Sequence, residues 1–404
     1  MALVRGREDY THVEIAQEGA TWGDTSGIGT YYGMPLISED LNIERDPLPD
    51  TEEISSLGAR EALESGRLIV VGSITVRPRW DSIWWNSLWS SLGQEQLYAN
   101  KWVDNTTGHA NANAHVYTMS QTVPNAFHIR VWKAGPDATT GTVFTFRGCI
   151  VSEINWDQPN DNHAQVTFTF VGKDMVTTAV ADASPTISTI DGSVINKLRD
   201  LDQYKTATPP QDDYQSRLIY RGVDESPAEY AALANVNTFT INVNRGIDFD
   251  DPDVDTPDTV SKPGPQEQRE VTVSVEGKYS EGSPDVDHPY HDYMNDNITG
   301  LAVLYSSATK ITGATNDSYA WLMVVPRIVW TAGTANIDTG GTITYSAEGT
   351  AIAATDVNAN TLAPDGQSGS TFFTSPANPE AYFVAAVANT DEPSVDTVFG
   401  PGVN

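Results

Sequence analysis

The chain has 404 residues, 39% of them hydrophobic, which is enough for two or three domains with packed cores. Acidic residues number 54 against 23 basic ones, and the formal charge of −31 argues against tight nucleic-acid binding through Lys and Arg at phosphates. The single cysteine, Cys149, excludes an internal disulfide framework and lies in an apolar run typical of a core strand.

The large negative charge needs an explanation, because self-repulsion destabilises a compact state. Molar salt shortens the Debye length to ~3 Å and removes most of that repulsion. An acidic chain with few lysines is therefore typical of a halophilic cell. We expect the protein to lose order in dilute buffer, and to need no cofactor beyond loosely bound Na⁺, K⁺ or Ca²⁺.

No apolar run approaches the ~20 residues that a membrane helix needs. Residues 1–10 also lack the apolar segment of a signal peptide, so we expect neither membrane contact nor export.

Short strand patterns dominate the chain and are separated by Gly, Pro, Asn and Asp. Helical patterns are few: one follows Asp81, one lies near Ser226 and runs to Leu233, and one follows Ser283. The sequence therefore predicts an all-β protein with a few short helices.

Three segments in the first half have counterparts in the same order in the second half. Each counterpart keeps the alternation of apolar and polar residues, so the same face would be buried in both copies. This order favours an internal duplication, and hence two tandem β domains. The paired segments are 41–46 with 241–246, 74–80 with 273–279, and 166–172 with 343–349.

The repeat gives a map of the chain with two β domains, two arms and a linker rich in Asp, Pro and Tyr. The predicted parts are an N-terminal arm 1–32, a first β domain 33–178, a linker with a short helix 179–233, a second β domain 234–353 and a C-terminal arm 354–404.

Four short motifs together resemble the tail tube (major tail) proteins of tailed phages and haloarchaeal tailed viruses. The resemblance covers roughly residues 15–353, while the insert 98–140 and the long tail after residue 353 depart from it. The motifs are Gln17–Gly23, which contains Thr-Trp-Gly, then Ser38–Arg45, Gly72–Thr75 and Phe168–Asp174.

The resemblance implies a small β-barrel or sandwich repeated twice, which forms rings that stack into a hollow tube. With two domains in each chain, three chains would make a pseudo-sixfold ring. The implied partners are further copies of the chain, a tape-measure protein and tail-end proteins, with viral DNA in transit and no sequence-specific binding. The implied location is the virion tail, assembled in the cytoplasm of a halophilic archaeal host.

Two acidic loops occupy the same place in the two copies and are candidates for reaching other subunits. An equally valid interpretation is that they are only solvated loops. A wall of carboxylates would also repel phosphates and let DNA slide through a tube. The assembly-loop candidates are Thr51, Glu52, Glu53, Asp248, Asp250, Asp251, Asp253 and Asp255.

Two further clusters invite a functional interpretation beside a structural one. Asp285, Asp287, His288 and His291 have the residue types of a metal site, but they fall where the first copy has a tryptophan-rich helix. We therefore expect a packing helix at both places. The first of these helices contains Trp84, Trp85 and Trp89, which could instead stack on sugars or bases if exposed.

Catalytic motifs such as Gly-x-Ser-x-Gly, a Walker loop or His-Glu-x-x-His are absent from the sequence, so we do not expect an enzyme. Two alternatives to a tube subunit stay open. One is a carbohydrate-binding or adhesive β-sandwich on the virion, based on the tryptophans. The other is a virion-associated hydrolase centred on His288 and His291.

Overall fold

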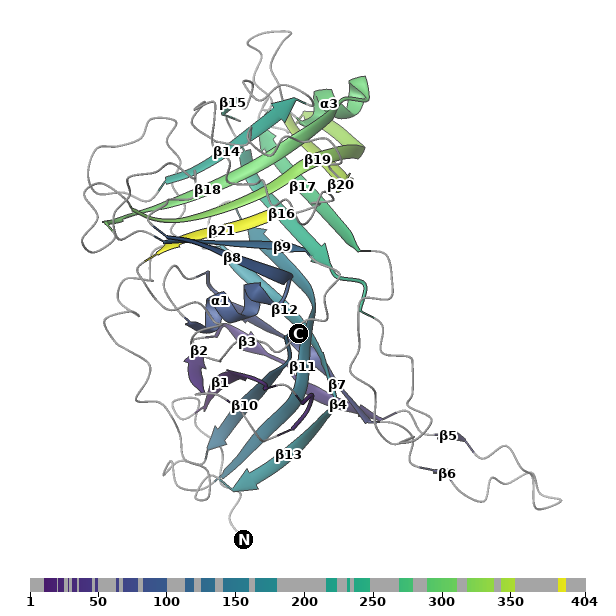
Figure 1. Cartoon of the computed structure of the whole chain (residues 1–404). Coiled ribbons are helices and arrows are strands. Elements are labelled where there is room, and N and C mark those ends of the chain that lie inside the picture. Colours follow the sequence, from purple (N-terminus) through teal and green to yellow (C-terminus); the bar gives the residue numbers. More distant parts are fainter. Residues whose placement is uncertain are drawn as a thin grey trace, which may run out of the picture.

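The computed structural model confirms the all-β prediction, because strands dominate the described residues and the helices among them are short (Figure 1). The described residues are 11–19, 21–24, 28, 31–34, 36–45, 48–49, 63–64, 68–78, 83–99, 113–119, 125–134, 141–159, 164–179, 216–223, 231–232, 236–247, 269–278, 289–310, 318–337, 343–352 and 384–389.

The described elements of the first half are β1 (Thr11–Gln17), β2 (Tyr32–Met34), β3 (Ser38–Glu39), β4 (Asn42–Arg45), β5 (Leu48–Pro49), β6 (Leu63–Glu64), β7 (Leu68–Val76), α1 (Ile83–Ser90), β8 (Gly93–Ala99), β9 (Asn113–Met119), β10 (Phe127–Ala134), β11 (Gly141–Gln158), β12 (Gln165–Gly172) and β13 (Asp174–Ala179). Those that follow are β14 (Ser216–Val223), β15 (Ala231–Ala232), β16 (Val236–Asn244), β17 (Glu270–Lys278), α3 (Pro289–Asn295), β18 (Ile298–Lys310), β19 (Ser318–Ile337), β20 (Ile343–Ala351) and β21 (Val384–Asn389).

Eight strands form one antiparallel row if β3 and β4 are counted together, since both pair with β7 in one register. The order of this strand row is β3/β4, β7, β12, β11, β16, β17, β20 and β19. In Figure 1, β4 lies in the lower half of the molecule, and β19 and β20 lie in the upper half.

The first four strands of the row and the last four have the same pairings in the same order. Both β11 and β19 contain an irregularity at corresponding points, between Val151 and Glu153 and between Trp330 and Ala332. Two aligned lines of partners cross the row, Asn42–Val71–Val171–Ile150 in the first half and Asn242–Thr272–Thr350–Val329 in the second.

These pairings correct two of the three matches expected from the sequence. Segment 41–46 does correspond to 241–246, because Asn42 and Asn242 occupy the same place. In the other two matches the second copy must shift by two residues, since Gly72, and not Ile74, corresponds to Val273. A two-residue shift leaves every side chain on the same face, so the alternation of residue types could not detect it.

Additional strands extend the long strands β11 and β19 beyond the row. β10 and β13 flank the first part of β11, and β18 and β21 flank the first part of β19. β1 continues the sheet from β10, and β21 lies between β19 and β9, which in turn pairs with β8.

The expected domain boundaries stay predictions, but several described strands bear on them. β14 lies in the range expected as a linker and pairs with β18 along its whole length, and β21 lies in the expected C-terminal arm. Ala231–Ala232 form β15, a short strand, where the sequence led us to expect a helix; residues 224–230 lie outside the described part of the chain.

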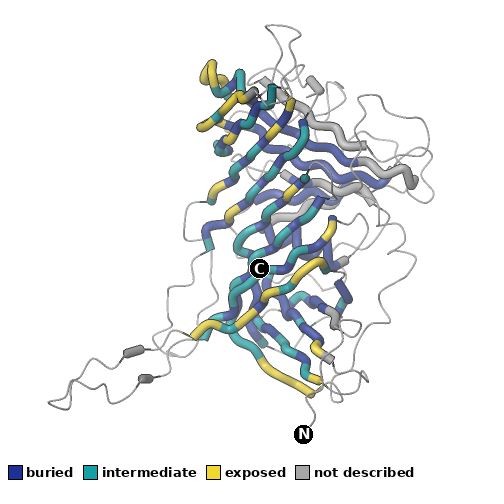
Figure 2. Tube along the Cα trace, turned by 180° about the vertical axis from the view of Figure 1, so that it is seen from behind, coloured by how far each residue is buried: buried dark blue, intermediate teal, exposed yellow. Residues whose placement is uncertain are grey.

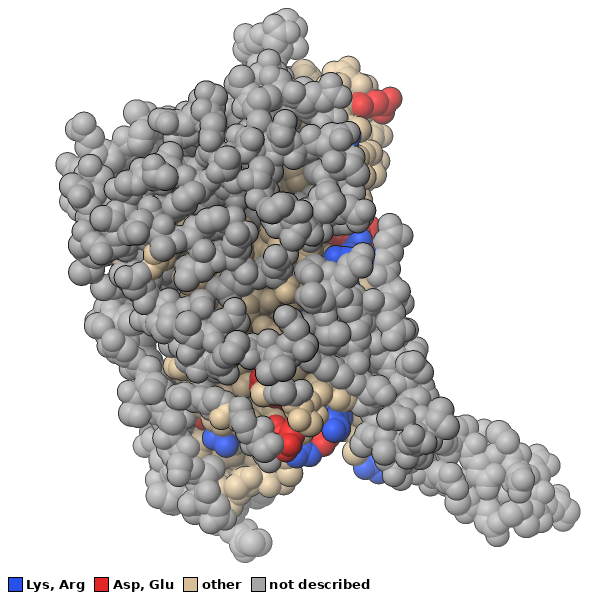
Figure 3. Space-filling view, in the orientation of Figure 1, with Lys and Arg blue, Asp and Glu red and all other residues tan. Residues whose placement is uncertain are grey.

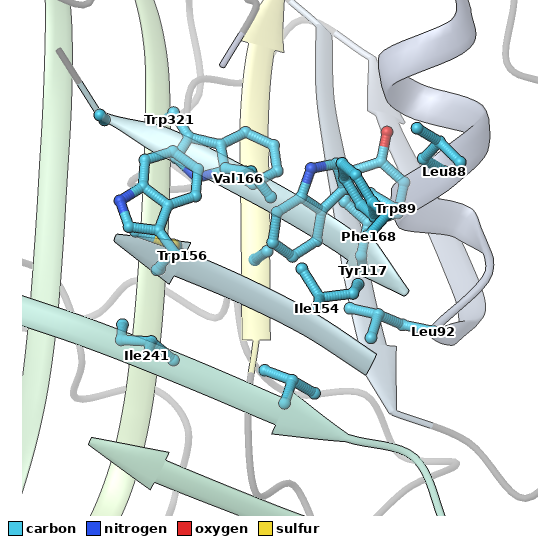
Figure 4. Close-up of a cluster of buried hydrophobic side chains, with 14 of the residues drawn as sticks. Leu88, Trp89, Leu92, Tyr117, Ile154, Trp156, Val166, Phe168, Ile241 and Trp321 are labelled. Atoms are coloured by element: carbon cyan, nitrogen blue, oxygen red, sulfur yellow. The ribbon is translucent and has the colours of Figure 1, made fainter. Parts of the chain in front are cut away.

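One aromatic core joins the two halves (Figure 4). Trp156 of β11 and Trp321 of β19 are stacked, with ring centroids 6.0 Å apart and planes within 5°. The Trp156 indole also donates a hydrogen bond to the hydroxyl of Tyr305 on β18, at 3.2 Å. That hydroxyl in turn donates to Oε1 of Gln158 at 3.0 Å, so the buried polar atoms of this core form a hydrogen-bonded chain.

Candidate assembly surface

The strand row has one apolar face toward the core and one polar face toward solvent. Period-two alternation produces this division, and Figure 2 shows buried segments alternating with more accessible ones along the strands. Carboxylates outnumber cations on the polar face. Its charged members, by register, are Asp40, Glu44, Arg77, Glu153, Asp157, Glu270, Glu276, Lys278 and Glu348.

Hydrogen bonds between neighbouring strands hold the side chains of the polar face in place. Thr75 and Thr167 share a hydroxyl contact at 3.0 Å, and Thr334 and Ser346 share one at 2.7 Å. The Asn242 amide donates to Oε1 of Glu153 across the middle of the row. These cross-strand contacts run from the first half to the second, so the polar face is one continuous surface.

Acidic and basic side chains also lie together on the described surface. Figure 3, drawn in the orientation of Figure 1, shows described acidic and basic side chains next to one another in the lower half.

The two halves meet where β11 pairs with β16, from Glu153 opposite Asn244 to Gln158 opposite Phe239, and we call this pairing the internal junction. Arg245 follows β16 directly and is only 1% exposed. Its backbone N–H donates to the carbonyl of Ser152 at 3.0 Å, and its guanidinium donates to the carbonyl of Val151 at 3.4 Å. Burial, with the charge of Arg269 as a second cause, lowers the pKa of Arg245 to about 10, so the side chain stays charged at neutral pH.

Each end of the strand row has an edge that pairs with no described strand. At one end, β3/β4 pairs with β7 and its other side has no partner among the described strands, with Asp40, Asn42 and Glu44 exposed. At the other end, β19 pairs with β20 beyond Ala332, while β18 reaches only to Val329. We call these two the open edges. An unpaired edge presents backbone N–H and C=O groups that a further strand can pair with.

The buried carboxylate of Glu18 holds the Thr-Trp-Gly motif near the N-terminus against the sheet. Glu18 accepts hydrogen bonds from the backbone N–H groups of Gly23 at 2.7 Å and Gly148 at 2.5 Å, and lies 2.8 Å from Nε2 of His128. The Trp22 indole donates to the carbonyl of Gly148 at 3.0 Å.

Gly148 has φ +65, and a Cβ there would lie 2.7 Å from Nε1 of Trp22. The motif therefore requires a glycine at that point of β11. Sequence reasoning missed the role of Glu18, although this carboxylate stands inside the motif, shortly before Trp22 and Gly23.

The helices lie where the repeat predicts them. Trp84, Trp85 and Trp89 are 5%, 0% and 1% exposed, so these indoles fill the core and offer no face to a sugar or base. His291 lies in α3, whereas Asp285, Asp287 and His288 lie outside the described residues. Within the part of the chain that the structure describes, no three His, Cys, Asp or Glu side chains gather as a metal site.

The assembly-loop candidates cannot be compared with the structure in the same way. Thr51, Glu52, Glu53, Asp248, Asp250, Asp251, Asp253 and Asp255 all lie outside the described residues. Their role therefore stays a prediction.

The comparisons with known proteins agree with the resemblance of the motifs. A family described as "Phage tail tube protein" matches residues 102–351, which is more than half of the chain. A search of curated proteins found no match. None of the described helices has the length and apolar character to cross a membrane.

Proposed function

This chain belongs to the phage tail tube protein family, and from this premise we propose that it assembles into stacked rings that form the hollow tail tube of a virion. Its role in this proposal is structural and not catalytic. Viral DNA passes through the tube during ejection without sequence-specific binding.

The observation that carries the proposal is the strand row with its continuous polar face. A sheet of this kind, buried on one side and polar on the other, suits a wall that separates a protein core from a water-filled channel. The carboxylates of this face, including Glu153 in the middle of the row, supply a negative lining. Phosphates are repelled by such a lining, so DNA slides and does not adsorb.

The two corresponding halves support a trimeric ring with pseudo-sixfold symmetry. If the halves arose by duplication, each chain supplies two equivalent units, and three chains supply six. Stacking of rings then gives axial growth, and the acidic loops 46–66 and 246–267 are our candidates for contacts between rings.

The remaining partners and the host follow from the family and the charge. We propose a tape-measure protein and tail-end proteins as partners, and a virion location after assembly in the host cytoplasm. The charge of −31 supports a halophilic host, and we propose an archaeal one because the motifs resemble those of haloarchaeal tailed viruses. Loosely held Na⁺ or K⁺ would be enough to screen the carboxylates.

Negative-stain electron microscopy of the untagged full chain, concentrated in molar KCl, tests the proposal. We expect hollow rings or tubes with three- or sixfold end views. Monomers that remain single under these conditions but are retained on a glycan matrix would overturn it in favour of the adhesive alternative. Melting curves at low and molar salt test the host proposal, because an unchanged melting temperature would contradict screening of carboxylate repulsion.

A further inference from the structure

We propose that Arg245 and Arg269 form a binding site for a small inorganic anion, and that chloride occupies this site in molar salt. The site lies at the end of β16 and the start of β17, beside the internal junction. Both residues belong to one chain, so the inference goes beyond the tube function and does not depend on it.

The pairing of β16 with β17 brings the two arginines together. Its last pair is Asn244 opposite Glu270, and one further step along both strands places Arg245 opposite Arg269. Asn244 and Glu270 are exposed on the polar face, so by alternation the two arginines leave the sheet on the other face. The charge of Arg269 also acts on Arg245, which agrees with this proximity.

Arg245 is a buried cation, and part of its guanidinium has no partner. The residue is only 1% exposed, and Nη1 donates a long hydrogen bond to the carbonyl of Val151, at 3.4 Å. Nη2 is buried and has no hydrogen-bond partner in the described part of the chain. Neither Arg245 nor Arg269 forms an ion pair with a described residue.

A buried arginine without a carboxylate is unexpected in a chain with 54 acidic residues. Arg147 shows the usual arrangement, because its guanidinium donates two hydrogen bonds to the carboxylate of Asp174. This contact raises the pKa of Arg147. The charge that acts on Arg245 is instead that of a second arginine, so the site carries two positive charges in a strongly negative protein.

A buried charge without a counter-charge is unfavourable, because burial removes hydration that nothing replaces. Arg245 does not avoid this by losing its proton, since burial first and Arg269 second lower its pKa only to about 10. An anion between the two guanidinium groups would replace their repulsion by two attractions, and it would accept a hydrogen bond from Nη2. The charge balance of the site therefore favours a bound anion.

The burial of Arg245 limits the anion to a small one. With 1% of the residue exposed, a DNA phosphate or another polymeric anion cannot reach this guanidinium. Arg269 is partly accessible, so a small ion from solvent can approach on that side. Chloride is the anion that molar KCl or NaCl supplies, and at that concentration even a site of modest affinity is filled.

The first half has no equivalent site and provides the control. Arg45 is the counterpart of Arg245, but it is exposed and stands opposite Leu68, which carries no charge. Water hydrates the guanidinium of Arg45, so it needs no bound counter-ion. We therefore expect an effect of chloride at Arg245 and none at Arg45.

Urea unfolding of the full chain at constant molar potassium tests the site, with potassium gluconate replaced stepwise by potassium chloride. Gluconate is too bulky for a site this buried, and the constant potassium keeps the screening of carboxylates the same. The stability of the parent should rise with chloride and level off below molar concentration, as binding to a single site requires. Arg245→Met keeps a long side chain without the charge, and most of this rise should disappear in it.

The difference in stability between Arg245→Met and the parent gives a second readout. In gluconate the buried charge of the parent is uncompensated, so the variant should compare more favourably with the parent there than in chloride. The same difference in both salts would mean that Arg245 is only a buried cation, and would overturn the proposal. The control Arg45→Met should respond to chloride as the parent does, and an equal loss of the response in this control would also overturn it.

Chlorine NMR of the folded protein detects the ion without unfolding. Exchange of bound chloride broadens the chloride signal, so we expect excess line width with the parent and Arg45→Met but not with Arg245→Met. Arg269→Ala changes a partly exposed residue, and it should raise the chloride concentration that half-saturates the site about tenfold, because one charged donor is lost. Equal line widths with all four proteins would overturn the site, whether or not the chain forms a tube.

Discussion

Helices α1 and α3 follow β7 and β17, which occupy corresponding places in the two halves of the strand row. All described side chains of α1 are buried. The ring of Trp89 has four ring neighbours, at centroid distances of 4.8 to 6.4 Å: Trp85, Phe168, Trp156 and Trp321. In α3, by contrast, Met294 is 60% exposed.

Helix α3 packs Tyr290 and Tyr293 against the core and adds a hydrogen-bonded contact, where α1 is held by indole packing. The Trp330 indole donates to Oγ1 of Thr299 at 2.7 Å, and that hydroxyl donates to the buried carboxylate of Asp292 on α3 at 3.2 Å. The places of Thr299 and Trp330 in the first half are taken by Phe127 and Val151, which are apolar. The two halves therefore share the same strand pairings but hold their helices by different contacts. The strand pairing differs less between the halves than the helix contacts do.

The largest effect that separates the two helices should come from Trp89→Ala. Removing a buried indole leaves a cavity and should lower the free energy of unfolding by about 3–5 kcal/mol. The matched change on the other helix is Tyr293→Ala, whose ring is partly buried against Gly333 and should cost about 1–2 kcal/mol. Guanidinium unfolding of the dissociated chain, followed by tryptophan fluorescence and circular dichroism, measures both.

Equal losses in these two variants would contradict the difference that we draw between α1 and α3. Trp84→Ala is a reference within α1, because this indole is buried and belongs to the same helix as Trp89.

The tryptophan helix shows what sequence reasoning can and cannot reach. Spacing and the repeat placed both helices correctly, and alternation identified most strands of the row. Sequence reasoning matched Val273 with Ile74, two residues away from its true counterpart Gly72. The error stayed hidden because alternation has a period of two, so a shift by two residues leaves the pattern unchanged. The pairing of β21 with β9 and β19 also stayed hidden, since it joins segments far apart in the chain that no local pattern connects.

The assembly surface was less predictable than the fold. Carboxylates are so abundant in this chain that their number could not indicate which of them share a face. The register of the strand row sorts them, and the internal junction became visible only through the pairing of β11 with β16. Arg45 and Arg245 did stand in matching segments of the sequence, but their different burial is a property of the structure alone.

The first half holds the N-terminal segment through Glu18. Glu18→Gln should lower the free energy of unfolding by about 2–3 kcal/mol, because the amide has only one acceptor oxygen and its nitrogen cannot accept the second of the two backbone hydrogen bonds from Gly23 and Gly148. Limited proteolysis near residue 24 should become faster than in the parent protein. A control change at an exposed carboxylate, Glu348→Gln, should have an effect within about 0.5 kcal/mol. A Glu18→Gln variant as stable as this control would contradict the role of the Glu18 carboxylate in holding the motif on the sheet.

The hydrogen-bonded chain of the second half is tested by Thr299→Val, which keeps the shape of the side chain but removes its hydroxyl. The Trp330 indole and the Asp292 carboxylate both lose this partner, so we expect a loss of about 2 kcal/mol in the free energy of unfolding. Thr299→Ser retains the hydroxyl and should recover most of the loss. The comparison of the two helices fails if the serine variant is no more stable than the valine variant.

The smallest effect concerns Glu39, which stands in the first half where the second half has Phe239. Burial raises the pKa of the Glu39 carboxyl, and Lys133, 4.0 Å away, offsets part of this increase. Because the pKa in the folded protein is higher than in the unfolded chain, the folded state binds more protons between these two values. The folded protein is therefore favoured at low pH, and this contribution is lost as the pH rises through the pKa of the folded state.

Glu39→Gln removes this titration while keeping the size and polarity of the side chain. The stability of the parent relative to the Glu39→Gln variant should therefore fall as the pH rises from below ~4.5, by less than about 1 kcal/mol because the group is partly accessible to solvent. Urea unfolding of both proteins across this range measures the difference, and all other titrating groups cancel in it. A parent protein that gains stability relative to the variant with rising pH would mean that the attraction of Lys133 outweighs burial at this edge. In that case Lys133 would already balance the charge of Glu39 in the single chain. Burial would then not distinguish Glu39 from its buried counterpart Phe239.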